Sequence, residues 1–161
     1  MSSTPSDRET VEFHGENGLS LIADEWNRGS SRSADRPTIL MLHGGGQNRF
    51  SWKHTGQILA DHGFHVIALD ARGHGDSDRS PGAEYTVDAF STDVTRVLDQ
   101  IARPVAIVGA SMGGLTGIQV AHQAGPAQVS ALVLVDVVPR FEKDGSARIR
   151  DFMFKHVHGF D

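Results

Sequence analysis

The chain of 161 residues contains no cysteine. This absence excludes disulfide bonds, thiolate metal sites and a cysteine nucleophile, and it fits a reducing compartment. Long apolar runs are also lacking, because the longest, residues 131–138, is interrupted by Asp136 and is far shorter than the roughly 20 residues of a membrane helix. The polar start, residues 1–9, lacks the apolar segment of a signal peptide. We therefore expect a cytoplasmic protein without a membrane partner.

The sequence also lacks a basic stripe. It carries 15 basic and 20 acidic residues, which are interspersed and give a net charge of -5. A phosphate backbone requires clustered positive charge, so nucleic acid is not an expected partner. The nine histidines have no spacing typical of metal ligands, so we expect neither a metal nor another cofactor.

One domain is expected, since domains cluster at roughly 100 to 150 residues. Residues 1–9 are rich in serine, threonine, proline and charge and are predicted to be a disordered tail. The core is assigned to residues 10–139, and residues 140–161 to the start of a cap or a linker region. Two short alternating segments, 10–14 and 19–27, predict a hairpin at the start of the core.

Continuous apolar runs dominate the rest of the core and predict strands that are buried on both faces of a parallel sheet. They lie at residues 38–42, 65–69, 105–108 and 131–135. Helical patterns lie between the runs, at residues 52–62, 87–102 and 111–123, with Thr86 as an N-cap. This alternation is typical of an α/β fold with a mostly parallel, doubly wound sheet.

Ser111 stands within Gly109-Ala110-Ser111-Met112-Gly113, which fits the pattern G-x-S-x-G. A predicted strand leads into this segment and a predicted helix leads out, so the serine is expected on a cramped turn with an exposed hydroxyl. A side chain at either glycine would crowd the neighbouring elements. Open α/β sheets place their sites at this carboxyl end. We interpret Ser111 as a nucleophile, with a simple helix N-cap as the alternative.

A glycine tract, His43-Gly44-Gly45-Gly46, directly follows the predicted strand 38–42. Glycine lets backbone N–H groups approach a substrate oxygen closely. Together with the N–H of Met112, one N–H of this tract would hold the oxyanion of a tetrahedral intermediate. Gly45 is the preferred donor and Gly44 the neighbouring alternative. The alternative interpretation of the tract is a flexible glycine turn without a catalytic role.

A third motif, Asp70-Ala71-Arg72-Gly73-His74-Gly75-Asp76-Ser77, follows the predicted strand 65–69. The three motifs, in this order after successive strands, resemble the amino-terminal half of the α/β-hydrolase fold superfamily. With serine at position 111, the motifs resemble the serine-nucleophile branch of this superfamily. That branch includes the esterases, the cofactor-free haloperoxidases (perhydrolases) and the carbon-carbon bond hydrolases. The resemblance implies a structural loop for the third motif. It also argues against epoxide hydrolases and haloalkane dehalogenases, which carry Asp as nucleophile.

What this resemblance implies is hydrolysis of a small ester or related acyl substrate through an acyl-enzyme. In the family, an acid and a base histidine follow the nucleophile. Asp136 ends a predicted strand and is a candidate acid, whereas no histidine occupies the expected base position. We therefore expect the 161-residue chain to be a fragment of a longer enzyme and inactive alone. The alternatives to an ester hydrolase are a non-catalytic fragment, an interaction module, a perhydrolase or a carbon-carbon bond hydrolase.

Two further expectations concern surfaces. The small-molecule substrate pocket is assigned to residues at and just after the glycine tract: His43, Arg49, Phe50 and Trp52. The apolar segment 130–135 would be an unprotected edge strand, which native sheets avoid. We expect a missing carboxyl-terminal half, a second copy in a homodimer, or a separate subunit to cover it.

Overall fold

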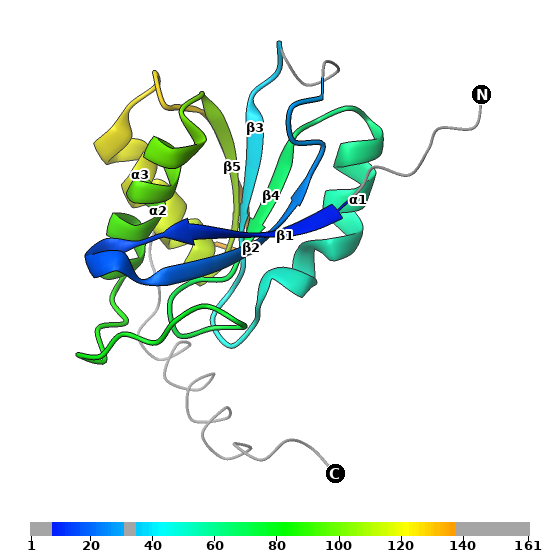
Figure 1. Ribbon diagram of the computed structural model, residues 1–161. Helices are drawn as coiled ribbons and strands as arrows, with labels where there is room; N and C mark the ends of the chain where they lie inside the picture. Colours follow the sequence, from blue (N-terminus) through cyan, green and yellow to red (C-terminus); the bar gives the residue numbers. More distant parts are fainter. Residues whose placement is uncertain (1–7, 31–34, 138–161) are drawn as a thin grey trace.

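The computed structural model describes residues 8–30 and 35–137, which fold around a six-stranded sheet in the order β1-β2-β4-β3-β5-β6 (Figure 1). The strands are β1 (Arg8–His14), β2 (Ser20–Trp26), β3 (Thr38–Leu42), β4 (Val66–Leu69), β5 (Val105–Ala110) and β6 (Val129–Val135). The strands β4, β3, β5 and β6 run parallel to one another. The hairpin of β1 and β2 adds to β4 in the antiparallel sense. The predicted mostly parallel α/β sheet is confirmed.

Helices cover both faces of this sheet. Helix α1 (Lys53–Asp61) packs on one face, and α2 (Val87–Ile101) and α3 (Met112–Ala124) lie together on the other (Figure 1). Every residue of β3 and β4 is buried, as their uninterrupted apolar sequences predict. One apolar cluster joins the sheet to α2 and α3, and a smaller one around Trp26 joins it to α1.

The element boundaries follow local signals. Helix α2 begins after Thr86, whose side-chain oxygen accepts a hydrogen bond from the N–H of Ala89 at 3.2 Å, as predicted. Strand β3 coincides with the predicted range, and β6 begins two residues before the predicted start at residue 131. A short 3-10 helix, η3 (Arg49–Trp52), precedes α1 and takes the first residue that we assigned to that helix.

The assignment of residues 1–9 to a tail is wrong at its end. Arg8 and Glu9 belong to β1, where they pair with Trp26 and Glu25. The Arg8 guanidinium also lies 3.2 Å from the buried carboxylate of Asp24, and this ion pair extends the strand beyond its apolar pattern. The region assigned to a cap or linker, 140–161, lies outside the described residues, as do 1–7. Among the helices of residues 8–137 that the structure describes, none is long and apolar enough to cross a membrane.

Candidate active site

Ser111 lies on the sharp turn between β5 and α3. Its backbone has φ 45° and ψ -111°, a left-handed conformation that side chains other than glycine rarely adopt. Its N–H donates to the carbonyl of Val135 on β6 (3.1 Å), and its carbonyl accepts from the N–H of Leu115 (3.0 Å). The side chain is exposed and makes no capping hydrogen bond. A simple N-cap role therefore does not explain this serine.

The two flanking glycines let the turn pack tightly, as predicted. A methyl group on Gly109 would overlap the carbonyl of Gly113, and one on Gly113 would overlap the carbonyl of Leu42 at the end of β3. The N–H of Gly113 donates to the carbonyl of His43 at 3.1 Å. The start of α3 is therefore fixed against the start of the glycine tract, which brings the first two motifs together.

The glycine tract lies beside Ser111 and offers one N–H group that is not engaged. The N–H of Gly44 donates to Oε1 of Gln47 (3.0 Å), and the N–H of Gly46 donates to Nε2 of His74 (3.3 Å). Among residues 8–30 and 35–137, the N–H of Gly45 has no acceptor. A Cβ built on Gly44 would lie 3.6 Å from Cβ of Ser111. This pattern supports Gly45 over Gly44 as the donor.

The N–H of Met112 is the second unengaged donor. It begins α3 directly after Ser111, and the described part of the chain provides no acceptor for it. The Met112 sulfur lies 3.9 Å from the position that a Cβ on Gly45 would occupy. Two unpaired N–H groups thus belong to adjacent backbone segments beside an exposed serine hydroxyl.

His43 is buried, and its ring links two loops. Nε2 lies 3.1 Å from the N–H of Ala71, while Nδ1 lies 2.8 Å from the carbonyl of Gly44. A carbonyl only accepts, so the proton sits on Nδ1 and Nε2 accepts from Ala71. Burial lowers the pKa of His43; the neighbouring His74 also lowers it, and the Gly44 carbonyl and Asp70 oppose the shift. The ring is therefore neutral and holds the tract to the loop after β4.

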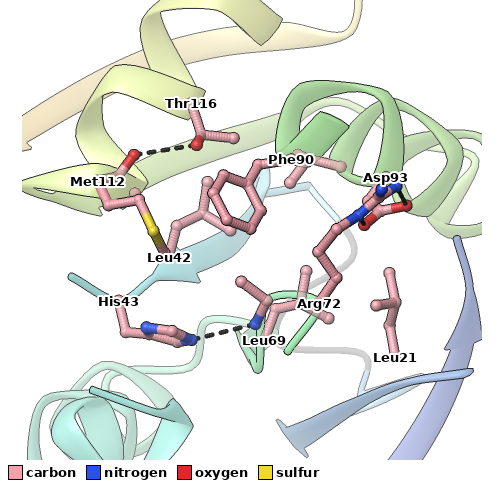
Figure 2. Close-up of a pocket in the computed structure, with 12 residues that line it drawn as sticks. Leu21, Leu42, His43, Leu69, Arg72, Phe90, Asp93, Met112 and Thr116 are labelled. Atoms are coloured by element: carbon pink, nitrogen blue, oxygen red, sulfur yellow. Dashed lines mark hydrogen bonds and ion pairs between the residues drawn. The ribbon is translucent and has the colours of Figure 1, made fainter. Parts of the chain in front are cut away.

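A small, mostly apolar hollow lies beneath the glycine tract, between the sheet and helices α2 and α3 (Figure 2). Met112 and His43 line it on the side of the turn, and the ion pair of Arg72 with Asp93 lines the far end. The apolar lining comes from Leu21, Leu42, Leu69, Phe90 and Val94. Of the predicted pocket residues, His43 alone lines this hollow.

Arg49 does not line this hollow, and its assignment to the substrate pocket stays a prediction. Its side chain is buried, and its guanidinium lies within 3.1 Å of the carboxylates of Asp24, Asp70 and Asp76. Burial opposes the charge, yet the hydrogen bonds that Arg49 donates to the three carboxylates raise its pKa above its ordinary range. Its cationic group is therefore committed to fastening η3 to β2 and β4.

The two aromatic residues near Arg49 differ in their surroundings. Trp52 is partly buried and packs against the apolar cluster between the sheet and α1, and its assignment to the pocket stays a prediction. Phe50 is half exposed and stacks on the Arg49 guanidinium, whose carbon lies 4.3 Å from the ring centroid. A pocket role for Phe50 stays a prediction.

The third motif forms a tightly held loop, in agreement with its predicted structural role. The Asp70 carboxylate accepts from the backbone N–H groups of Arg49 and Asp76. Arg72 is buried and makes two hydrogen bonds to Asp93 on α2, at 2.6 and 2.7 Å. These charged contacts connect η3, α2 and the loop at the carboxyl end of the sheet.

No base is found near Ser111 among the residues that the structure describes. His65 bonds to Thr38 and Glu25, His62 to the carbonyl of Ile58, and none of the described histidines has a hydrogen bond to Ser111. Asp136 is exposed at the end of β6, with φ 52°, and its role as the acid stays a prediction. His156 and His158 lie outside the described residues. Within the described ranges, no cluster of three His, Cys, Asp or Glu residues could hold a metal ion.

Sequence reasoning missed two side chains at this site, Gln47 and His74, which hold the N–H groups on either side of Gly45. Gln47 stands three residues from Gly44 and offered a local signal for an amide side chain bonding back onto the tract. His74 is separated from Gly46 by 28 residues, and no local pattern indicates their contact.

Comparisons with known proteins agree with this fold. Residues 37–153 match the sequence model of a family described as alpha/beta hydrolase fold. The chain is 27% identical over 150 residues to protein phosphatase methylesterase 1 of Bos taurus, covering 90% of this chain and 38% of that protein. It is 38% identical over 104 residues to an esterase of Mycobacterium tuberculosis, covering 64% of this chain and 34% of that protein.

Among solved structures, an alpha/beta hydrolase from Novosphingobium aromaticivorans superposes with a TM-score of 0.78 and 27% identity. The match covers 94% of this chain and 51% of that one. The chain thus spans less than half the length of the two curated relatives that it matches. Since the family match covers most of the sequence and all three motifs, the chain belongs to the alpha/beta hydrolase fold family.

Proposed function

We propose that this chain carries the nucleophile and the oxyanion donors of a serine hydrolase that acts on a small carboxylic ester. One observation carries the proposal: the exposed Ser111, held at a positive φ, lies beside two backbone N–H groups that have no acceptor among the described residues. Gly45 is exposed and Met112 begins α3, where backbone N–H groups have no intrahelical acceptor, so both groups can donate to a bound ligand. An oxyanion supplies the missing acceptor.

The reaction follows from these groups. Oγ of Ser111 attacks the ester carbonyl as a base removes its proton, and the N–H groups of Met112 and Gly45 stabilise the resulting oxyanion. Collapse of this intermediate releases the alcohol, which takes the proton, and leaves an acyl-serine. Water then attacks the acyl group, and the carboxylic acid leaves as the serine regains its proton.

We place the base and its acid partner outside the described residues. The histidines near the tract, His43 and His74, use both ring nitrogens for other contacts. The relatives extend well beyond the matched region, which leaves room for a histidine and an acid in a longer protein. The 161-residue polypeptide is then expected to lack activity on its own.

Ester hydrolysis is preferred over other reactions because two relatives are named as a methylesterase and an esterase. The exposed Ser111 on its turn, beside two N–H groups without an acceptor among the described residues, supports a serine as the nucleophile. The size and chemistry of the acyl group remain open to assay with a series of short p-nitrophenyl esters.

A fluorophosphonate probe tests the proposal, because it reacts only with a serine that a base has activated. The protein isolated from its natural source is treated with the probe, digested and analysed by mass spectrometry. We expect stoichiometric modification of Ser111 and loss of labelling in Ser111→Ala. Ser51→Ala is the matched control, since Ser51 is an exposed serine in η3.

Labelling elsewhere, or none, in the naturally occurring protein would refute the proposed nucleophile. The same experiment on the isolated 161-residue polypeptide locates the base. Absence of labelling there, beside labelling of a longer natural protein, supports a base outside this segment. Equal labelling of both would place the base within residues 1–161.

A further inference from the structure

The contacts around the glycine tract assign a role to a residue of the third motif. The tract contains three consecutive glycines, and side chains accept hydrogen bonds from the N–H groups of two of them. Gln47 accepts from Gly44 and His74 accepts from Gly46, so that Gly45 lies between two anchored neighbours. The direction of the Gly45 N–H therefore depends on both contacts.

The protonation of His74 suits this contact. Nδ1 lies 3.1 Å from the carbonyl of Arg72, which can only accept, so Nδ1 carries the proton. Nε2 then has a free electron pair, which faces the N–H of Gly46 at 3.3 Å. A neutral ring in this one tautomer satisfies both bonds.

The ring of His74 is also held in place from its sides. Its centroid lies 5.0 Å from that of His43 and 6.3 Å from that of Phe90 on α2. The backbone N–H of His74 donates to the carbonyl of Ala71 (2.9 Å), and its carbonyl accepts from the N–H of Ser77 (3.1 Å). The contact to Gly46 thus originates from a fixed loop.

Buried charged groups hold the loop that carries His74. Arg72 bonds to Asp93 with two short hydrogen bonds, and Asp70 accepts from the N–H of Asp76. Gly75 approaches Asp70 so closely that an added Cβ would overlap the carboxylate. These contacts fix the position of the loop and therefore the position from which His74 contacts Gly46.

We propose that His74 is a positioning residue of the reaction: by accepting the N–H of Gly46, it orients the glycine tract so that the Gly45 N–H faces the substrate oxygen at Ser111. This inference rests on the serine hydrolase function proposed above. His74 itself touches neither the serine nor the substrate. Its effect passes through Gly46 to the neighbouring peptide group.

Two substitutions separate positioning from a general structural role. His74→Leu keeps a comparable volume but removes the acceptor, whereas His74→Gln offers a side-chain oxygen that can accept from Gly46. His122→Leu is the matched control, because this histidine is exposed in the last turn of α3. Urea unfolding of each variant checks that the fold is retained.

The first measurement is amide hydrogen exchange on the ¹⁵N-labelled 161-residue chain, which needs no activity. We expect exchange at Gly46 to accelerate roughly fivefold to tenfold in His74→Leu, as loss of one hydrogen bond predicts, and to return toward the original rate in His74→Gln. Gly44, which is held by Gln47, serves as the internal reference. An unchanged rate at Gly46 in His74→Leu would overturn the inference.

The second measurement is ester hydrolysis by the naturally occurring protein. A small displacement of a catalytic group costs about 100-fold in rate, so His74→Leu should lower kcat by about that factor with little change in KM. His74→Gln should recover most of kcat. An unchanged kcat despite faster exchange at Gly46 would show that the contact does not serve the reaction, and would overturn the inference.

Failure of the proposed function gives a different pattern. If the unsubstituted protein neither hydrolyses esters nor reacts with the fluorophosphonate probe, the nucleophile assignment is refuted, and the reaction role of His74 is refuted with it. The exchange rates at Gly46 would still report whether His74 holds the tract.

Discussion

The backbone of Ser111 adopts a conformation that stores strain at the site. Its positive φ is disfavoured by the Cβ atom, and such residues cost of order 1–3 kcal/mol. The cost is offset by the close packing of β5, α3 and the end of β3 around the turn. This strained backbone conformation, maintained by the packing, directs the hydroxyl away from the helix that follows.

Ser111→Gly should therefore be more stable than Ser111→Ala, although neither variant retains the proposed nucleophile. Glycine adopts a positive φ freely, while alanine keeps the strained Cβ, so we expect a difference of about 1 kcal/mol in the free energy of unfolding. Urea denaturation measures it. At Ser51, in the ordinary helical backbone of η3, the order should reverse. Equal stability of the two Ser111 variants would contradict stored strain.

The buried His43 makes stability depend on pH. Its pKa is lowered in the folded protein, chiefly by burial, so the unfolded chain binds more protons between the lowered value and the ordinary value of about 6.5. The free energy of unfolding should therefore be fully retained above that ordinary value. It should decline as the pH falls through it, until the lowered pKa is reached.

Urea unfolding midpoints, measured at several pH values from about pH 8 down to pH 5, test this expectation. His43→Asn removes the titrating group and should flatten part of the decline. NMR titration of the ring identifies His43 directly. A His43 that titrates at or above the ordinary value would contradict the assigned neutral state.

At the scale of elements, the hairpin of β1 and β2 is attached to the parallel strands partly through buried charge. Arg49 bridges Asp24 on β2 and Asp70 after β4, both of which are buried. Removing one partner from such a group leaves charges buried without compensation, which costs about 3–5 kcal/mol.

We therefore expect Arg49→Ala to lower the free energy of unfolding by several kcal/mol, on the order of the cost of an unpaired buried charge. Arg28→Ala is the matched control, because Arg28 is largely exposed and lies 3.7 Å from Glu25. An exposed pair contributes about 0–1 kcal/mol. Urea unfolding compares the two variants, and similar losses would contradict the importance assigned to the Arg49 cluster.

The parts of the fold that could be predicted are those with local signals. Apolar runs gave the parallel strands, Thr86 gave the start of α2, and the glycines around Ser111 gave the turn. The tail boundary was misplaced because the Arg8 and Asp24 pair joins residues that are distant in sequence. Arg49 was assigned to the pocket for its nearness to the tract, while its partners Asp24 and Asp70 lie on β2 and directly after β4, more than 20 residues away in sequence. The contact of His74 with Gly46 was missed for the same reason.

At the scale of the whole molecule, β6 forms one border of the described sheet. Val133, Leu134 and Val135 on this strand are exposed, with Val133 half accessible to solvent. Apolar strands with free N–H and C=O groups attract further strands. We infer that another strand covers β6, and that in the isolated polypeptide a second copy of the chain supplies it.

Sedimentation velocity should accordingly show association of the 161-residue polypeptide that increases with concentration. Val133→Lys should shift the chain toward monomer, since a charge on the border opposes strand pairing. Ile58→Lys is the matched control, because Ile58 is similarly exposed but lies on α1. A strictly monomeric chain at high concentration would contradict this inference.

The adjacency of β3 and β5 at the centre of the sheet has a consequence for assembly and ligand response. The glycine tract follows β3 and the serine turn follows β5, and these strands are joined by a pairing that spans more than 60 residues of sequence. The two halves of the site thus come into register only when this long-range pairing has formed. A phosphonate that bonds to Ser111 and accepts from Gly45 would connect both segments, so it should raise the melting temperature of the protein as well as block the proposed reaction.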